Sequence, residues 1–518
     1  MVGKVRKYDE VMQHIPNHAV IGTTSFGMGG LAEQLLVGLK EYHEKHQQPQ
    51  GLTFVSTAGS GISQGRGMDH LLAPGLLKRT INSYLGTSPL SGKKIQANEF
   101  EAYLLPQGII GQLYSNAARQ GPGVFSQVGI DTFIDPQQLG GKMNPKAHAA
   151  EDLVKEIELN GERWLHYQPL PINVAFIKAT YADAAGNLSI QHETAKLEIL
   201  ALATAAHNAG GVVIAQVEEI VENDTLPARD VTVPGMLVDY VVKAEPNYHM
   251  QTPFVHYKPA FSNEIRITLA DYHHMPLTAK KVVARRASLE FKKYSIINLG
   301  FGIPAEIGPV LSEAGQLKNY HLTTDLGGIG GMPAFGYNYG PSLNPDAVIR
   351  SEDTFALYHG GGLETTVIGF GQMDAHGNIN STLLGDLLVG PGGLIDITHG
   401  AQHIIFVGNF TIGGKLSVTE KGAVIDQAGQ APKFVNQLPY ITFSAKYARG
   451  RGKKITVITD RAVFEVNSEG FLCLTEIAPG LDLAHDILAW MEFEPRISDK
   501  LKVMDLSLYQ EEWQIYFK

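Results

Sequence analysis

Short apolar segments that end in glycine-rich turns recur along this chain, and helical patterns follow them. Residues 19–21 form the first predicted strand, SFGMGG at 25–30 forms a turn, and residues 31–40 form a helix with leucines on one face. A second predicted strand, 52–56, again ends in glycines and precedes a helix-like segment at 68–81. Because strands that alternate with helices assemble into parallel sheets, this pattern predicts an α/β fold.

The same alternation continues through the first half of the chain. An apolar helix is predicted after the break at Pro106-Gln107-Gly108. Further strands are predicted at 173–178, 211–216 and 237–242, with a helix at 192–208 between the first two. SFGMGG does not match the GxGxxG pattern, so a Rossmann nicotinamide site is not expected.

The length of 518 residues exceeds what one compact core usually holds, so two domains are expected. The second half echoes the first, since GFGIPAEIG at 300–308 resembles the first turn and QMDAHGNINS resembles YADAAGNLSI. The pattern loosens between the halves, which places the domains at 1–275 and 285–518. Two facing α/β domains would form a cleft at their interface, where we expect the active site.

Composition excludes several classes of protein. The net charge of −10 argues against nucleic acid as the main partner, since phosphate binding needs clustered Lys and Arg. No export signal and no apolar stretch of roughly 18 residues is found, so no membrane association is expected. The single cysteine, Cys473, allows no internal disulfide, fits a cytoplasmic protein and is expected in the core. The adjacent His273 and His274 lack metal-ligand spacing and are expected at a surface or interface.

One carboxylate stands out in the motif HLTTDLGGIGGMPAFG at 321–336. A predicted strand, 320–324, delivers Asp325 onto a loop that contains four glycines and a proline. Glycine lets the backbone approach a ligand closely, so an acid at this strand exit is a plausible place for acyl chemistry. The alternative is that Asp325 only caps a turn, which is common for Asp beside Gly.

Backbone amides form a second candidate feature. The break before the predicted helix leaves the N–H groups of Gly108 and Ile109 unpaired at its N-terminus. Three more glycine loops follow Asp325, at 358–371, 389–397 and 407–415. So many flexible segments around one acid indicate a long ligand held largely by main-chain hydrogen bonds.

Together these motifs resemble the class I coenzyme A transferases, and most closely the fused acetate/propionate CoA-transferase branch. The resemblance spans about residues 20–500 and rests on LPQGII, FSQVGIDTFIDPQQLGGKMN, RDVTVPGMLVDYVV, TTDLGGIGGMPAFG, GGGLETTVIGFGQMDAHGNIN and GPGGLIDI. It implies two tandem CoA-transferase domains of the NagB/RpiA-like type, acyl-CoA and small carboxylic acids as substrates, and no metal or redox cofactor. It also implies a homo-oligomer, either a dimer or a tetramer.

The resemblance implies an exchange of CoA between a short-chain acyl-CoA and a carboxylate such as acetate, through an acyl-enzyme anhydride and an enzyme–CoA thioester. The family nucleophile is a glutamate, and Asp325 stands at its position. The resemblance assigns the oxyanion to the amides of Ile109 and of Gly392 or Gly393, acyl orientation to Gln107, and CoA contacts to Gly361, Gly362 and Asn380.

The shorter side chain of Asp325 leaves other activities open, because it withdraws the carboxylate by roughly one C–C bond of about 1.5 Å. Water could then intercept the thioester, giving an acyl-CoA hydrolase, or the protein could bind acyl-CoA without turnover. Glu352 and Glu364 are candidate replacement acids, although ordinary loop charges are the more common reading. A sugar-phosphate isomerase on a similar scaffold is a further alternative, but fold alone does not assign chemistry.

Overall fold

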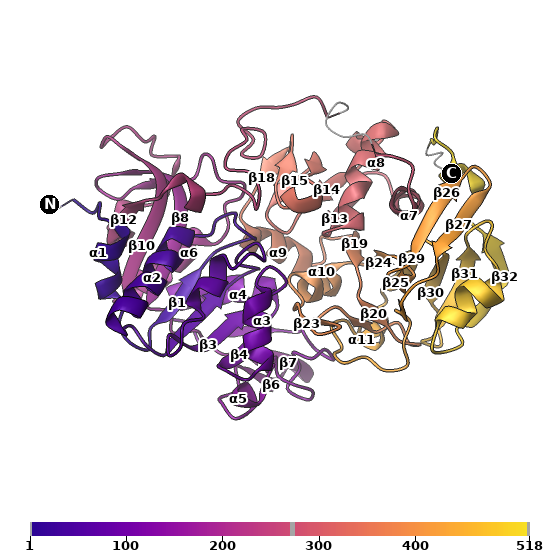
Figure 1. The fold of residues 1–518 in the computed structure, drawn as a ribbon, viewed down its shortest axis with the longest axis horizontal. Coiled ribbons are helices and arrows are strands. Elements are labelled where there is room, and N and C mark those ends of the chain that lie inside the picture. The colour runs from indigo at the N-terminus through magenta and orange to yellow at the C-terminus, as the bar shows by residue number, and fades with distance from the viewer. Residues whose placement is uncertain (1–2, 270–274, 515–518) are drawn as a thin grey trace. The chain divides into compact units, whose positions relative to one another are not determined.

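The computed structural model describes residues 3–269 and 275–514, so His273 and His274 lie outside the described residues. The chain forms two compact units (Figure 1). The first unit consists of Met1–Ile265, Val348–Ala356 and Gly385–Asp396, and the second of Arg266–Ala347, Leu357–Leu384 and Ile397–Lys518. Two stretches from the second half of the chain therefore belong to the first unit.

A mostly parallel sheet forms the centre of the first unit. Its parallel strands lie in the order β12-β10-β8-β1-β2-β3-β4, and β9 and β11 extend it in antiparallel fashion beside β8. The strands are β1 (Val20–Thr23), β2 (Leu52–Ser56), β3 (Leu77–Asn82), β4 (Glu101–Leu104), β8 (Val174–Asp183), β9 (Leu188–Ser189), β10 (Val212–Val221), β11 (Val231–Val233) and β12 (Tyr240–Lys243). Strands are present at all five predicted places, 19–21, 52–56, 173–178, 211–216 and 237–242, but β8 and β10 each continue five residues beyond the predicted end.

The helices of this unit are α1 (Tyr8–Val11), α2 (Glu33–His46), α3 (Pro89–Gln96), α4 (Gln107–Ala118), α5 (Pro145–His148) and α6 (Ile199–Asn208). The helix predicted at 192–208 is confirmed only from Ile199, because residues 192–198 form turns and loop. Three further strands, β5 (Val124–Ser126), β6 (Val154–Leu159) and β7 (Glu162–Tyr167), form a small separate sheet.

The helix predicted at 68–81 is wrong. The structure has a short 3₁₀ helix, Gly67–Leu71, and then the strand β3. Pro74 and Gly75 lie between them, and Gly75 has a φ of +81°. Proline has no N–H to continue a helix and glycine favours this left-handed turn, so the helical pattern is interrupted in its middle.

The second unit is built on a sheet in the order β15-β14-β13-β19-β24-β29-β30-β31-β32. The five strands from β14 to β29 are parallel, whereas β30 is antiparallel to both its neighbours. The strands are β13 (Ile296–Leu299), β14 (His321–Thr323), β15 (Gly328–Ile329), β19 (Thr365–Gly369), β24 (His403–Gly408), β29 (Lys454–Thr459), β30 (Ala462–Val466), β31 (Leu472–Ile477) and β32 (Arg496–Val503). We call the two edges where the parallel strands end and begin the carboxyl edge and the amino edge.

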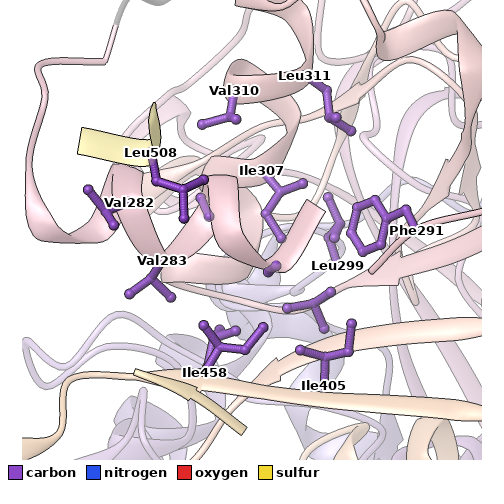
Figure 2. Close-up of a cluster of buried hydrophobic side chains, with 14 of the residues drawn as sticks. Val282, Val283, Phe291, Leu299, Ile307, Val310, Leu311, Ile405, Ile458 and Leu508 are labelled. Atoms are coloured by element: carbon purple, nitrogen blue, oxygen red, sulfur yellow. The ribbon is translucent and has the colours of Figure 1, made fainter. Parts of the chain in front are cut away.

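Helices α7 (Ala279–Ser288) and α8 (Ile307–Glu313) pack on this sheet through one continuous hydrophobic core. Val282 and Val283 of α7 belong to the same buried cluster as Ile405 of β24 and Ile458 of β29 (Figure 2). Burial of such side chains stabilises the unit by about 1.5–3 kcal/mol each. The remaining helices are α9 (Ser351–His359), α10 (Leu394–Gly400) and α11 (Ala445–Gly450).

Short strand pairs complete the second half of the chain. They are β16 (Met332–Pro333) with β17 (Ser342–Leu343), β20 (Gln372–Met373) with β21 (Ile379–Asn380), β22 (Leu383–Leu384) with β23 (Leu387–Leu388), β25 (Thr411–Ile412) with β28 (Ala431–Pro432), and β26 (Lys415–Thr419) with β27 (Gly422–Gln427). β18 (Ala347–Val348) lies next to β15 in the sheet order. These pairs lie between the elements of the α/β pattern and were not predicted.

The position of Cys473 and the length of the helices can also be compared with the sequence-based expectations. Cys473 is only half-buried in β31, because alternate residues of this strand face away from the core, so the expectation of a core position is wrong. Within residues 3–269 and 275–514, every helix is too short or too polar to cross a membrane.

Candidate active site

The N-terminus of α4 presents backbone donors in the first unit. Gln107 is the first residue of the helix, and Gln107 and Ile109 are both buried. The N–H of Gln107 donates to the carbonyl of Gly392 at 3.3 Å, and the N–H of Ile110 donates to Pro106 at 3.1 Å. Within the described residues the N–H of Ile109 has no hydrogen-bond acceptor. It is therefore available to an anion, in a position where the helix dipole favours negative charge.

The glycine loop that precedes α10 lies beside this helix end in the same unit. The N–H of Gly392 donates to the carbonyl of Ser83 at 2.9 Å, and the N–H of Leu85 donates to Val389 at 2.6 Å. The N–H of Gly393 has no acceptor in the part of the chain that the structure describes. Of the two glycines predicted as oxyanion donors, Gly392 already has its acceptor, so Gly393 is the one whose amide can serve a ligand.

Asp396 lies in the first turn of α10 and links the glycine loop to α4, and no sequence motif predicted this role. Its side chain is fully buried, and Oδ2 accepts from the N–H of Gly108 at 3.0 Å. A Cβ at position 108 would lie 2.7 Å from the ring of Phe355 and 2.8 Å from Oδ1 of Asp396, so only glycine fits there. This carboxylate fixes the first turn of α4, because it satisfies one of the helix's unpaired donors. No sequence signal links two residues so far apart.

A second buried carboxyl group, Glu198, packs against the same helix. It precedes α6, and a Cβ at Gly111 of α4 would lie 3.4 Å from its Cγ. Burial raises the pKa of Glu198 to about 7, and the negative charge of Glu352 also raises it. Contacts with Ser351 and Thr57 lower the pKa, but by less. The group therefore changes its charge near neutral pH.

Asp325 occupies the carboxyl edge of the second unit's sheet. It follows β14 and is 6% exposed. The turn around it is closed by the N–H of Gly327, which donates to Thr324 at 3.0 Å, and by the N–H of Thr324, which donates to Gly328 at 3.1 Å. Gly327 has a φ of +103°, which a residue with a Cβ would adopt only with strain. The glycines of this motif thus hold the acid in a tight turn.

Two buried tyrosines lie close enough to Asp325 for its charge to affect them. Burial, and then the charge of Asp325, raise the pKa of Tyr339 well above its usual range. The Tyr339 hydroxyl donates to the carbonyl of Leu299 at 2.7 Å. The Tyr358 hydroxyl lies 2.7 Å from Oγ1 of Thr323 and accepts from Asn298 at 3.2 Å. Both phenols stay protonated at neutral pH and support the strand ends beside the acid.

Asn380 lies in the segment that follows β19 and is fully buried. Its Nδ2 donates to Gln372 at 2.9 Å and to the carbonyl of Leu383 at 2.6 Å. Its Oδ1 accepts from the amides of Thr382 at 3.0 Å and Leu383 at 3.2 Å. The side-chain amide is therefore occupied in shaping its own turn.

Gly361 and Gly362 lie between α9 and β19, at the amino edge of the sheet. Their N–H groups donate to Tyr358 and Leu357 at 3.0 Å each, which is how a helix C-terminus is closed. The structure does not bring these two glycines to Asp325, which lies at the carboxyl edge. Glu364 is also at the amino edge, where Oε2 accepts from the amide of Ile296 at 2.7 Å. Glu352 belongs to the first unit, in the first turn of α9.

Within the described residues, no group of three or more His, Cys, Asp or Glu side chains is placed to hold a metal ion. The second unit offers a buried carboxylate, a group that can act as a nucleophile. The first unit offers open amides, which can stabilise an oxyanion.

Comparisons with known proteins define the class of the chain. The model of the coenzyme A transferase family matches residues 6–244. The chain is 39% identical to caffeate CoA-transferase of Acetobacterium woodii, over 97% of each chain. It is 37% identical to acetate CoA-transferase YdiF of Escherichia coli (strain K12), over 96% of this chain and 94% of the relative.

Solved structures agree with this assignment. The crystal structure of the YdiF apoenzyme from Escherichia coli O157:H7 superposes with a TM-score of 0.92 at 36% identity and covers 98% of this chain and 96% of the other. The thioester complex of the same protein with CoA gives a TM-score of 0.90 at 36% identity, over 98% of this chain and 96% of the other. The chain belongs to the coenzyme A transferase family and has its two-domain α/β fold with mostly parallel sheets. It is a CoA-transferase, as its sequence motifs predicted, and CoA takes part as a substrate.

Proposed function

We propose that the enzyme exchanges CoA between a short-chain acyl-CoA and a small carboxylate such as acetate, with Asp325 as the nucleophile. The single observation that carries the assignment of the nucleophile is the buried Asp325 carboxylate, held at a strand exit by a glycine turn. The substrates rest on the family and on relatives that are named for acetate and caffeate. The two CoA-transferase domains are proposed to span 1–275 and 285–518.

The proposed reaction has two exchanges at one carboxyl group. A carboxylate oxygen of Asp325 attacks the thioester carbonyl, the C–S bond breaks, and CoA leaves as a thiolate with an acyl–aspartyl anhydride on the enzyme. The thiolate then attacks the aspartyl carbonyl, which releases the first free acid and leaves a CoA thioester on Asp325. The acceptor carboxylate reverses these steps, so covalent catalysis divides one difficult exchange into easier ones.

The residues of the first unit are proposed to stabilise the oxyanions formed in each attack. The open amides of Ile109 and Gly393 support this role, and one such donor typically contributes about 2.7–4 kcal/mol. Gln107 is proposed to orient the acyl group. CoA contacts at Gly361, Gly362 and Asn380 stay predictions, and Asn380 would have to contact CoA through its backbone because its side-chain amide is occupied.

The test is mass spectrometry after incubation with acetyl-CoA and trapping with hydroxylamine or borohydride. We expect the modification at Asp325, and a transfer rate that falls by at least about 10⁴-fold in Asp325→Ala, because the nucleophile is removed. Asp325→Glu restores the missing methylene and is expected to raise the rate by up to about 100-fold, the usual cost of a misplacement of about 1 Å. The exposed Asp499→Ala serves as the control.

A second function, acyl-CoA hydrolysis, is favoured by the shortened acid alone. Free CoA that accumulates without any acceptor, together with no trapped adduct, would replace the transferase proposal with a hydrolase in which Asp325 activates water. Binding of acetyl-CoA with neither adduct nor turnover would identify an acyl-CoA-binding protein. A cytoplasmic location and a homo-oligomer, dimer or tetramer, are proposed on the family resemblance, and light scattering during gel filtration tests the oligomer.

A further inference from the structure

A hollow of about 520 Å³ opens in the second unit, at the amino end of β29 and the adjoining end of β30. It is lined by residues of α11, of the loop that follows it and of the turn after β30, namely Lys446, Arg449, Gly450, Gly452, Lys453, Val466, Asn467 and Ser468. We call it the cationic hollow. Its volume lies within the range of roughly 300–1,000 Å³ that small-molecule sites usually have.

The lining carries positive charge without a compensating carboxylate. Three of its residues, Lys446, Arg449 and Lys453, are cations, and no Asp or Glu lines it. Within the described residues, none of the three forms an ion pair with a carboxylate. Positive charges of this kind attract an anion.

Two of the cations are held in place by backbone oxygens. Lys453 is 8% exposed, and its Nζ donates to the carbonyl of Thr398 at 3.1 Å and to the carbonyl of His399. An ammonium group has three protons, so one remains for a ligand. Burial, and then the positive charge of Arg451, lower the pKa of Lys453 to about 8. A bound anion would stabilise the charged form of this lysine.

Arg449 spans the hollow from the helix to the turn after β30. Its Nη2 donates to the carbonyl of Ser468. A guanidinium group has five N–H donors in a rigid fork, so this single contact orients Arg449 and leaves donors for a second partner. Lys446 is exposed at the rim and adds a mobile charge.

The cationic hollow lies at the opposite edge of the sheet from Asp325. Asp325 follows the carboxyl end of β14, and β14 runs parallel to β29 through the strands between them. The hollow is at the amino end of β29, a strand of six residues. The strand register places Asp325 level with Val457 of β29. That is four residues, or about 13 Å along the strand direction, from Lys453, and three strands lie between β14 and β29. A ligand in the hollow would therefore be separate from the reacting carboxyl group.

We propose that the cationic hollow binds a small ligand with two adjacent phosphate groups. Two lysines and one arginine fork match the three or so negative charges of a diphosphate, and arginine recognises phosphate oxygens in pairs. The volume exceeds what a single phosphate fills and leaves room for a nucleoside. The same chemistry is present in pyrophosphate, in ADP and in the nucleotide end of CoA, so the test must distinguish these sources.

Titration calorimetry with pyrophosphate, ADP and CoA tests the proposal on the full-length protein. Lys446→Ala and Arg449→Ala remove two of the cations, and Arg449→Lys keeps the charge but not the fork. Lys421→Ala, an exposed lysine in the turn between β26 and β27, is the matched control. We expect binding of one pyrophosphate or ADP per chain, weakened at least tenfold by each alanine variant of the hollow and unchanged in the control.

Binding of pyrophosphate, ADP and CoA distinguishes the possible natural ligands of the hollow. Tighter binding of ADP than of pyrophosphate would identify a nucleotide site, and equal binding would identify a site for the diphosphate alone. CoA that competes with ADP in a manner sensitive to Lys446→Ala would identify its nucleotide end as the ligand. The proposal is overturned if neither pyrophosphate nor ADP binds at millimolar concentration, or if all variants bind them as the control does.

The same variants separate this inference from the proposed catalytic function. At saturating acyl-CoA, CoA transfer is expected to keep its ordinary rate in Lys446→Ala, because this residue is on the other edge of the sheet from Asp325. The KM for acyl-CoA is expected to rise only if the nucleotide end of CoA is the ligand of the hollow. Loss of diphosphate binding with transfer intact supports the hollow as a separate site. If Asp325→Ala loses CoA transfer but still binds diphosphate, the result supports Asp325 as the nucleophile and the cationic hollow as a separate diphosphate site.

Discussion

The two units use buried carboxyl groups in different ways. In the first unit, Asp396 accepts a hydrogen bond from Gly108 and thereby fixes the N-terminus of α4, while Glu198 packs against the same helix at Gly111. In the second unit, Asp325 is held by a turn of its own motif and faces two buried tyrosines. Asp396 and Glu198 position backbone donors, whereas Asp325 is suited to react. The same functional group is thus a support in one unit and the proposed nucleophile in the other.

The largest expected effect on stability is in the first unit and is tested with Glu198→Gln. The ordinary pKa of this carboxyl group is 4.5, and the folded protein raises it to about 7. Between these values the folded protein holds a proton that the unfolded chain has lost, so stability falls as the pH rises through this window. The difference corresponds to about 3 kcal/mol above pH 7.

Glutamine has the shape of the protonated acid and carries no charge to bury. We therefore expect Glu198→Gln to melt at a higher temperature than the parent protein at pH 8 and at the same temperature at pH 4.5, measured by scanning calorimetry. The exposed Glu469→Gln provides the control. A difference in melting temperature between the parent and Glu198→Gln that does not change with pH would show that Glu198 keeps its charge in the folded protein. The contrast drawn between Glu198 and Asp325 would then fail.

The second effect concerns the support of α4 and uses Asp396→Ala. This change leaves the N–H of Gly108 buried without its acceptor and frees the first turn of the helix. A buried unsatisfied donor costs about 1–3 kcal/mol. We expect a 10- to 100-fold loss of CoA transfer, since the amide of Ile109 would no longer be held in place.

Steady-state kinetics distinguish this role from a binding role. The loss is expected mainly in kcat, with KM for acyl-CoA little changed, and Asp396→Asn should recover part of the rate because it keeps an acceptor oxygen. Asp386→Ala, at an exposed position in the turn between β22 and β23, is the control. Full activity in Asp396→Ala would mean that the helix end does not depend on this carboxylate.

The smallest effect concerns the tyrosines of the second unit and uses Tyr358→Phe. The hydroxyl group that this change removes lies between Thr323 and Asn298, beneath the strand that leads to Asp325. Loss of these hydrogen bonds is expected to cost about 1–2 kcal/mol of stability. The transfer rate is expected to fall only a few-fold, because the turn around Asp325 is closed by its own backbone.

Tyr294→Phe, at an exposed position, should leave both stability and rate unchanged. If Tyr358→Phe were as slow as Asp396→Ala, the reacting carboxylate would depend on side-chain support as much as the donors of the first unit do. The contrast between the two units would then fail.

Much of the fold could be predicted because its signals are local. The strand at 52–56 was predicted to the residue, and the helix that starts at Gln107 was expected from the break at Pro106. The helix predicted at 68–81 failed because Pro74 and Gly75 outweigh the apolar pattern around them. Cys473 was expected in the core from its apolar neighbours, yet successive residues of a strand face opposite sides.

The candidate site was predictable only in part. Asp325 at a strand exit and the amide of Ile109 at a helix start follow from short sequence patterns, and both lie where those patterns place them. The choice between Gly392 and Gly393 depends on Ser83, which is distant in the chain and takes the amide of Gly392. Asn380 was expected to face the ligand, but its side chain is occupied by its own turn.

Hydrophobic period, turn residues and long motifs can be recognised along the chain, so they predict the class of fold, the family and the acid proposed as the nucleophile. The tertiary structure alone decided which groups meet. It brought Asp396 to Gly108, placed Gly361 and Gly362 at the sheet edge opposite Asp325, and gathered three cations around one hollow. These contacts join residues distant in sequence, and only the packing of strands and helices determines the distances between them.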